Sequence, residues 1–301
     1  MMLDRIRFRR SWQPPRSART HPEERRITFL ELFYDLVYAV IIAELSHTLA
    51  GNISLTGIGS FVFLFIIVWW AWFNGAIYHD MHGNNDIRTC VFTFLQMCTV
   101  AAMAVFAHNA TGEGSVGFAL AYATFHLILT WLWWRTGIYD PNHRPLSQPY
   151  SLTFLITSVL FLVSIVIPAS WRFVLWVIAL LIDLALLSLI LTHPNEAIQN
   201  EINRIVLLSS SAVERFGLFT IIVLGEVVAG VVRGVAEYPH LSWRVGWIGM
   251  LGMIIAIGLW WTYFDFVSGR PPIERTSKIL WWIYLHLPVA MGIAAVGACL
   301  L

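Results

Sequence analysis

Apolar stretches of about 20 residues recur along the whole chain, and short polar breaks separate them. This is the length that a helix needs to cross the hydrocarbon core of a bilayer. The breaks contain Gly, Pro, Asn or charged residues, which commonly end helices. The pattern predicts an all-α, polytopic transmembrane helix bundle. It has about nine spans, at residues 27–50, 55–78, 88–108, 115–137, 150–168, 171–192, 204–232, 243–267 and 279–300. Because the connections are short, we expect consecutive helices to be antiparallel neighbours.

Composition supports a membrane protein. The 301 residues are 58% hydrophobic and 12% charged, whereas about 25% of the residues in a typical soluble domain are charged. The formal net charge of +1 gives no reason to expect a nucleic-acid partner. The three cysteines lie in apolar stretches without CxxC spacing, so the sequence predicts neither a disulfide framework nor a zinc site.

The positive charges are unevenly distributed. Eight of the 19 Lys and Arg residues precede the first span, and residues 1–26 are therefore expected to form a basic cytoplasmic arm beside anionic lipid headgroups. Residues 27–301 would form the transmembrane domain. If the N-terminus is cytoplasmic, the inner segments hold fifteen Lys and Arg residues and the outer segments hold three, Arg172, Arg233 and Arg244. This bias follows the positive-inside rule and predicts a cytoplasmic N-terminus.

The first predicted span, 27–50, is unusual because it contains Glu31, Asp35, Glu44 and His47. An aspartate at the centre of a membrane helix costs roughly 2.5–3.5 kcal/mol on insertion scales. Such residues persist where they face other helices, water or an ion. We therefore expect this helix to be buried inside the bundle, with partners supplied by the rest of the chain.

The depth of each ionisable residue follows from its position, because a helix rises 1.5 Å per residue. Glu31 and Asp35 lie at a depth similar to that of Glu214 and Arg215 on the seventh span. Near the outer surface, the level of Glu44 and His47 matches that of Glu226. The predicted charge network also includes three residues in the cytoplasmic halves of other spans, Asp183, Asp265 and His286.

Acids outnumber bases in this predicted network. A pair between Asp35 and Arg215 could be purely structural and fix the register of two helices. However, seven carboxylates face one intramembrane arginine and a few histidines. The remaining acids must be protonated, hydrated or bound to a cation. This excess is the physical reason to expect a function in addition to packing. The acids are Glu31, Asp35, Glu44, Asp183, Glu214, Glu226 and Asp265.

Three functions are compatible with these residues. The first is a transporter or channel that moves a small ion or solute, coupled to protons through the carboxylates. The second is an intramembrane enzyme using a metal or acid–base catalysis, and the third is a non-catalytic envelope protein. The chain contains no P-loop, GxGxxG or GxSxG motif. We favour transport over an enzyme, while the sequence leaves metal and cofactor undecided.

Two further sets of polar residues have simpler interpretations. A solvated cytoplasmic turn is expected to contain His79, Asp80, His82 and Asp86, and Asp86 would cap the third helix. A metal or gating role for this cluster is the alternative. His126, alone near the middle of the fourth span, is expected to be a core histidine.

Several stretches resemble the low temperature requirement A family. They are ELFYDLVYAVIIAELSH at 31–47, AWFNGAIYHDMHGNNDIRTCVFTFLQM at 71–97, VERFGLFTIIVLGEVV at 213–228, WWTYFDF at 260–266 and YLHLPVAMGIAAVG at 284–297. The resemblance implies a multi-pass protein of the bacterial inner membrane connected with growth in the cold, and it implies no settled biochemical activity. Family members tend to be longer than this chain. Where they commonly show a TDD-like run after the second span, this chain has His79-Asp80-Met81-His82.

Overall fold

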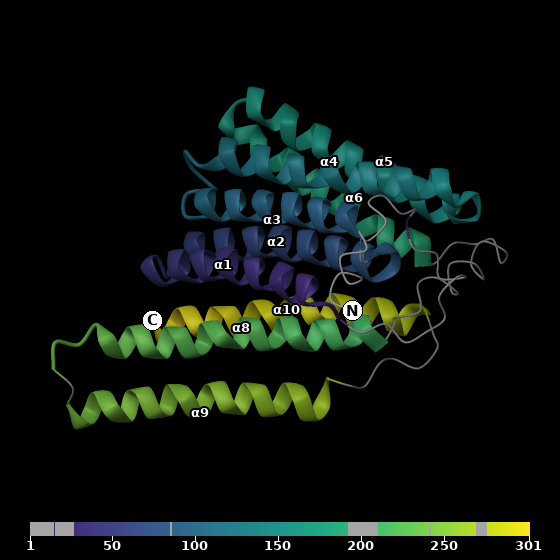
Figure 1. Ribbon diagram of the computed structural model, residues 1–301. Helices are drawn as coiled ribbons and strands as arrows, with labels where there is room; N and C mark the ends of the chain where they lie inside the picture. The colour runs from purple at the N-terminus through teal and green to yellow at the C-terminus, as the bar shows by residue number, and fades with distance from the viewer. Residues whose placement is uncertain (1–14, 16–26, 85, 192–209, 241, 269–275) are drawn as a thin grey trace, which may run out of the picture.

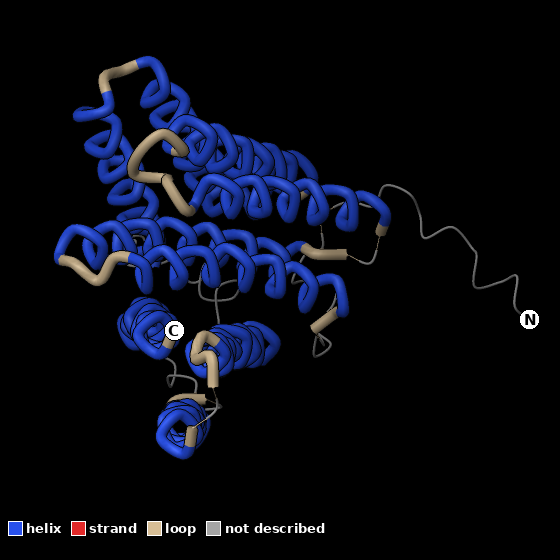
Figure 2. Tube along the Cα trace, turned by 90° about the vertical axis from the view of Figure 1, so that its left-hand side faces the viewer, coloured by secondary structure: helices blue, strands red, loops and turns tan. Residues whose placement is uncertain are grey.

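The computed structural model describes residues 15, 27–84, 86–191, 210–240, 242–268 and 276–301. These residues form helices and no strand (Figures 1 and 2). The helices are α1 (Phe29–Gly51), α2 (Leu55–His82), α3 (Ile87–Ala107), α4 (Ser115–Tyr139), α5 (Arg144–Val166), α6 (Ala169–Leu191), α8 (Ser210–Ala236), α9 (Trp243–Phe266) and α10 (Thr276–Leu300), with a short 3-10 helix, η2 (Pro141–His143). Eight helical segments among the described residues are long and apolar enough to cross a membrane. The predicted polytopic helix bundle is confirmed. α1, which carries three carboxylates, is not among the eight.

Side-chain caps fix where several helices begin. Four side chains each accept a hydrogen bond from a backbone N–H group in the first turn of the helix that follows, namely those of Thr28, Ser54, Asp86 and Ser242. These N–H groups have no partner inside the helix, so the caps satisfy them. The predicted capping role of Asp86 is confirmed, because its side chain accepts from the Thr89 N–H at 2.9 Å.

Three helix boundaries differ from the prediction by four to six residues, and one of them is the end of α8, which lies at Ala236 and not at 232. α2 continues to His82, so His79, Asp80 and His82 lie on the last turn of this helix and not in a loop. α5 begins at Arg144 and contains Pro149 in its second turn. A proline this close to a helix start removes one hydrogen bond without ending the helix. The basic arm of residues 1–26, Pro15 excepted, and the predicted start of the seventh span at 204–209 lie outside the described residues.

The helix carrying the most intramembrane acids lies at the centre of the packing. α1 contacts α2, α3, α8 and α10, as its position in Figure 1 shows, whereas α9 lies at the edge against α8. The expectation that consecutive helices are neighbours holds for α4 and α5 but not for α9 and α10; within the described chain, α10 packs mainly against α8. At Gly230 and Gly297 the backbones of α8 and α10 approach so closely that a Cβ on Gly230 would overlap the Gly297 carbonyl.

Aromatic side chains fill the space where α2 meets α8. Trp69 and Trp72 are almost completely buried, and the Trp72 ring stacks on Phe219 with centroids 3.9 Å apart. Phe216 packs edge-on against Trp72 with centroids 5.2 Å apart. These rings surround the polar groups of α1 with low-dielectric material, in which an unpaired charge would be costly.

Candidate functional site

The inner part of the predicted charge network centres on a salt bridge between α1 and α8. Arg215 Nη2 lies 2.9 Å from Asp35 Oδ1, and Arg215 Nε donates to Asp35 Oδ2 at 3.1 Å. Asp35 is fully buried and Arg215 is 3% exposed. A two-point contact of this kind is among the stronger hydrogen-bonded pairs in proteins, and Arg is the side chain whose geometry allows it.

Helix α2 completes the hydrogen bonding of both partners. The Trp72 indole N–H donates to Asp35 Oδ1 at 2.8 Å, and Arg215 Nη1 donates to the Ala76 carbonyl at 3.2 Å. The site therefore joins three helices, α1, α2 and α8. A buried ion pair is tolerated where additional hydrogen bonds satisfy the remaining donors and acceptors, and this pair meets that condition.

Glu31 lies between the surface and this salt bridge. Its Oε2 accepts from the Thr28 backbone N–H at 2.9 Å, closing a capping box at the start of α1. Its other oxygen, Oε1, lies 3.9 Å from Arg215 Nη1. Glu31 thus contacts both the cap that begins α1 and the arginine of the charge network.

Two tyrosines continue the polar groups deeper into the bundle. The hydroxyls of Tyr34 and Tyr38 lie 3.2 Å apart, and both side chains are fully buried. The Arg215 guanidinium lies 5.3 Å from the centroid of the Tyr34 ring, within the range of a cation–π contact. Gly75 of α2 makes room for this arrangement, because a Cβ at that position would overlap the Tyr34 hydroxyl.

Cavities lie at both ends of α1, where it meets α2 and α3. A cavity of about 380 Å³ at the start of α1 is lined by Glu31 together with His79 of α2 and Thr93 of α3. A cavity of about 330 Å³ near the end of α1 is lined by residues including Leu45 and Ser60. Among the described residues, α2 and α3 are not closely packed against each other, although they are consecutive. Glu31 and Leu45 are fourteen residues apart, so about 21 Å of packed structure separates the two cavities along α1.

Asp183 belongs to a different site from Asp35. It lies on α6, where it accepts a hydrogen bond from the Thr157 hydroxyl at 2.7 Å and its Oδ2 lies 3.4 Å from His126 Nε2. All three side chains are buried among α4, α5 and α6. From the sequence, Asp183 was predicted to belong to the charge network, and His126 was predicted to be a core histidine without a charged partner. The partnership of these two was missed, because helix depth does not reveal which helices are neighbours.

The three predicted outer residues are only partly assembled. Glu44 and Glu226 are half-buried and close enough to interact electrostatically, whereas His47 is exposed. Glu226 also interacts with Arg233, about two turns further along α8. The structure therefore places two acids of the outer layer together at the α1–α8 contact and turns the histidine away from it.

Glu214 and Asp265 do not join the buried network, because both side chains are exposed. His286 is buried, but its partners are the Trp282 carbonyl at 2.6 Å and the Tyr263 hydroxyl at 3.2 Å. Its ring packs against Phe216, whose ring in turn packs against Trp72 of the Asp35 site. The prediction that Glu214 lies in the inner network beside Arg215 is wrong, since adjacent residues on a helix point in directions about 100° apart.

The polar residues at the end of α2 have protein partners. His79 Nε2 lies 2.8 Å from the Gln96 side-chain oxygen on α3, and the Asp80 carboxylate accepts from the Ser211 hydroxyl on α8. No group of three or more His, Cys, Asp or Glu side chains in the described part of the chain is arranged to hold a metal ion.

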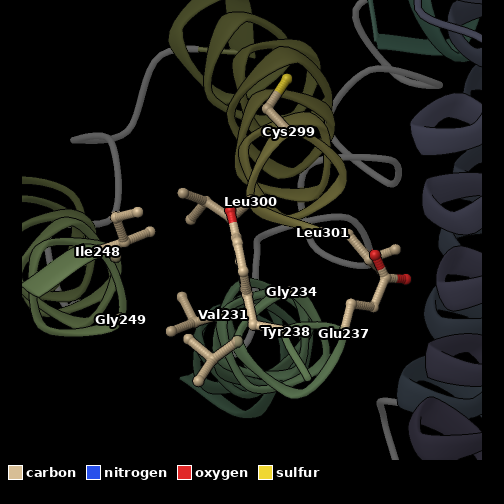
Figure 3. A pocket seen from close by; sticks show the side chains of 11 residues that line it. Val231, Gly234, Glu237, Tyr238, Ile248, Gly249, Cys299, Leu300 and Leu301 are labelled. Atoms are coloured by element: carbon tan, nitrogen blue, oxygen red, sulfur yellow. The ribbon is translucent and has the colours of Figure 1, made fainter. Parts of the chain in front are cut away.

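A separate cavity of about 390 Å³ lies at the opposite end of α8 from Arg215 (Figure 3). Tyr238, just beyond the end of α8, and Leu300 of α10 line it, together with Gly249 of α9. Val231, the first lining residue, is sixteen residues beyond Arg215, or about 24 Å along the helix. This cavity contains none of the predicted site residues.

The family model described as bacterial low temperature requirement A protein (LtrA) matches residues 26–301, nearly the whole helical region. The chain belongs to this family. A further match is an uncharacterised protein of Rhizobium meliloti (strain 1021), which is 26% identical over 298 residues that cover 91% of this chain and 69% of the relative. No solved structure matches the chain. The expected resemblance to the LtrA family is confirmed, and with it an integral, multi-pass membrane protein. The LtrA match includes every residue of the Asp35–Arg215 site.

Proposed function

We propose that this LtrA-family protein moves protons, alone or with a small ion or solute, and that Asp35 is the carboxylate that binds the transported or coupling cation. It would do so in the inner membrane of a bacterium, with a cytoplasmic N-terminus. The observation that carries the proposal is the position of the Asp35–Arg215 pair. It is fully buried at the junction of α1, α2 and α8, yet it is connected through Glu31 to a cavity.

The cavity gives a cation a route towards Asp35. Glu31 lines the cavity and has one carboxylate oxygen 3.9 Å from Arg215. A negative charge at the mouth attracts cations, and the low dielectric beyond it strengthens that attraction. Glu31 therefore provides an intermediate position between the cavity and the buried carboxylate.

Binding of a proton or another cation at Asp35 would compete with Arg215. Once the Asp35 charge is neutralised, the salt bridge between α1 and α8 is lost and Arg215 must find other acceptors, of which Glu31 is the nearest acid. Because this salt bridge joins α1 to α8, its loss removes a restraint on the relative position of the two helices. A change in the site is thereby converted into a change in helix packing, as alternating access requires.

The second cavity supplies an exit at the other end of the same helices. It lies among α1, α2 and α3, and packed side chains close the stretch between the cavities. The Tyr34 and Tyr38 hydroxyls are polar groups within that stretch, next to Asp35 along α1. A small shift of α1 relative to α2 and α3 would join the cavities through these hydroxyls.

Proton uptake into proteoliposomes tests the proposal. The purified full chain is reconstituted, a potassium gradient with valinomycin makes the interior negative, and a trapped pH-sensitive dye reports acidification. Wild-type protein should acidify the interior faster than empty liposomes do, and Asp35→Asn should reduce the rate to that of empty liposomes. Asp265→Asn is the matched control, because it makes the same chemical change at an exposed position and should leave the rate unchanged. Wild-type vesicles no faster than empty ones, or an Asp35→Asn rate equal to wild type, would contradict the proposal.

A further inference from the structure

A cavity of about 800 Å³ lies on the outer face of the α4–α5 hairpin, on a different side of the bundle from the Asp35 site. Its walls come from the last two turns of α4, around Trp134 and Ile138, and from α5 between Arg144 and Ile156. Leu152, Leu155 and Ile156 are exposed apolar side chains on this surface. The cavity is therefore an apolar groove that opens sideways, towards the lipid.

One end of the groove is polar and basic. Arg144 is exposed at the first turn of α5, and Gln148 is exposed one turn further along the helix. The lining contains one cation and no acidic residue. Since Arg144 begins a membrane-spanning helix, its side chain lies where the headgroups of the bilayer lie.

The Arg144 guanidinium is held in place but is not fully used. Its Nε donates to the Gly137 carbonyl at 2.9 Å, which fixes the side chain at the end of α4. The four N–H donors on its two terminal nitrogens have no acceptor in the described part of the chain and remain for a ligand. A guanidinium with a fixed orientation and free terminal donors matches the geometry of a phosphate group.

A buried hydroxyl beside Arg144 also lacks a partner. Ser147 is fully buried and lines the groove, and its Oγ has no hydrogen-bond partner among the described residues. A buried hydroxyl without a partner is costly, so a ligand oxygen at this position would be favourable.

The length of the groove fits one leaflet. From Arg144 to Ile156 the helix advances twelve residues, or about 18 Å. Half of a typical hydrocarbon core is about 15 Å. A molecule with a phosphate at Arg144 and an acyl chain along Leu152 and Ile156 therefore spans the groove from end to end.

From these features we propose that the α4–α5 groove is a specific binding site for an anionic phospholipid, with its phosphate on Arg144 and Ser147. The anionic class follows from the lining: a zwitterionic headgroup would place its ammonium group beside Arg144 with no carboxylate in the groove to receive it. The site is independent of the transport proposal, because none of its residues belongs to the Asp35–Arg215 network.

Native mass spectrometry of the detergent-purified full chain, titrated with phosphatidylglycerol or phosphatidylethanolamine, tests this assignment. Wild-type protein should retain phosphatidylglycerol about tenfold more strongly than phosphatidylethanolamine, because the ammonium group of phosphatidylethanolamine would lie beside the Arg144 guanidinium. Arg144→Gln should abolish that preference. Arg244→Gln, at an exposed arginine in the first turn of α9, is the matched control and should leave it intact. Equal retention of the two lipids by wild type, or an unchanged preference in Arg144→Gln, would overturn the proposal.

A second variant tests the apolar part of the groove. Leu152→Trp fills the groove without changing its charge. The variant protein should retain both lipids more weakly, by a similar factor, and its melting temperature should equal that of wild type. If Leu152→Trp retained phosphatidylglycerol as wild type does, the acyl chain would not lie along this part of α5 and the assignment would be wrong.

Discussion

At the scale of single residues, the structure resolves much of the imbalance between acids and bases. Asp35 is paired with Arg215, Asp183 with His126, and Glu31 with its own cap and with Arg215. The exposed acids Glu214 and Asp265 do not add buried negative charge. The feature that points to function is therefore the connection of one satisfied pair to a cavity, and not a surplus of unpaired carboxylates.

Removing one member of the central pair should strongly destabilise the protein. Arg215→Gln leaves the Asp35 carboxylate buried without its cation, and such changes typically cost about 3–5 kcal/mol. Thermal unfolding in detergent should show a clear drop in melting temperature. Glu214→Gln, the adjacent exposed residue on α8, is the control and should melt like wild type. An Arg215→Gln protein as stable as wild type would mean that the pair is not closed in the native state.

Gly75 is predicted to be intolerant of even one added methyl group. Gly75→Ala places a Cβ where the Tyr34 hydroxyl lies, and overpacking of this kind typically costs about 1–3 kcal/mol. Adding Tyr34→Phe removes the clashing oxygen and should restore part of the loss. Gly258→Ala on α9, where a Cβ meets no atom within 4 Å, should change the melting temperature little. Equal melting temperatures for the Gly75 and Gly258 variants would contradict the close approach of α1 and α2.

At the scale of elements, apolar length and break residues predicted nearly every helix, and helix depth brought Asp35 and Arg215 together correctly. Depth specifies a level in the membrane but neither the face of a helix nor its neighbours. For this reason the exposed Glu214 was included in the inner network, and the pairing of His126 on α4 with Asp183 on α6 was not foreseen. The cavities at the two ends of α1 also depend on the separation of α2 from α3, which no sequence pattern indicated.

The contact between α8 and α10 depends on Gly230. A Cβ there would overlap the Gly297 carbonyl, so Gly230→Ala should push the two helices apart and lower the melting temperature in detergent. Gly225, on the same helix, faces open space and provides the comparison, with Gly225→Ala expected to be neutral. If both variants melted at the same temperature, the two backbones would not be in contact.

At the scale of the whole molecule, the bundle needs a defined orientation for the Glu31 cavity to face the cytoplasm. The positive-inside bias predicts that the 109–114 loop is outside and the 140–142 turn is inside. In a chain whose native cysteines are replaced by serine, Thr111→Cys should react with a membrane-impermeant thiol reagent in intact spheroplasts, whereas Asn142→Cys should react only after lysis. The reverse pattern would invert the proposed direction of access.

The central claim is that the Asp35–Arg215 pair serves transport and not only packing, and the double variant Asp35→Asn/Arg215→Gln separates these roles. The two amides avoid an uncompensated buried charge, so the double variant should recover most of the stability lost in Arg215→Gln alone. It retains no group at this position that can exchange a proton. The decisive measurement is potential-driven proton uptake by proteoliposomes containing this double variant. We expect a folded, reconstituted protein whose uptake equals that of empty liposomes; uptake at the wild-type rate would contradict a role of this pair in transport.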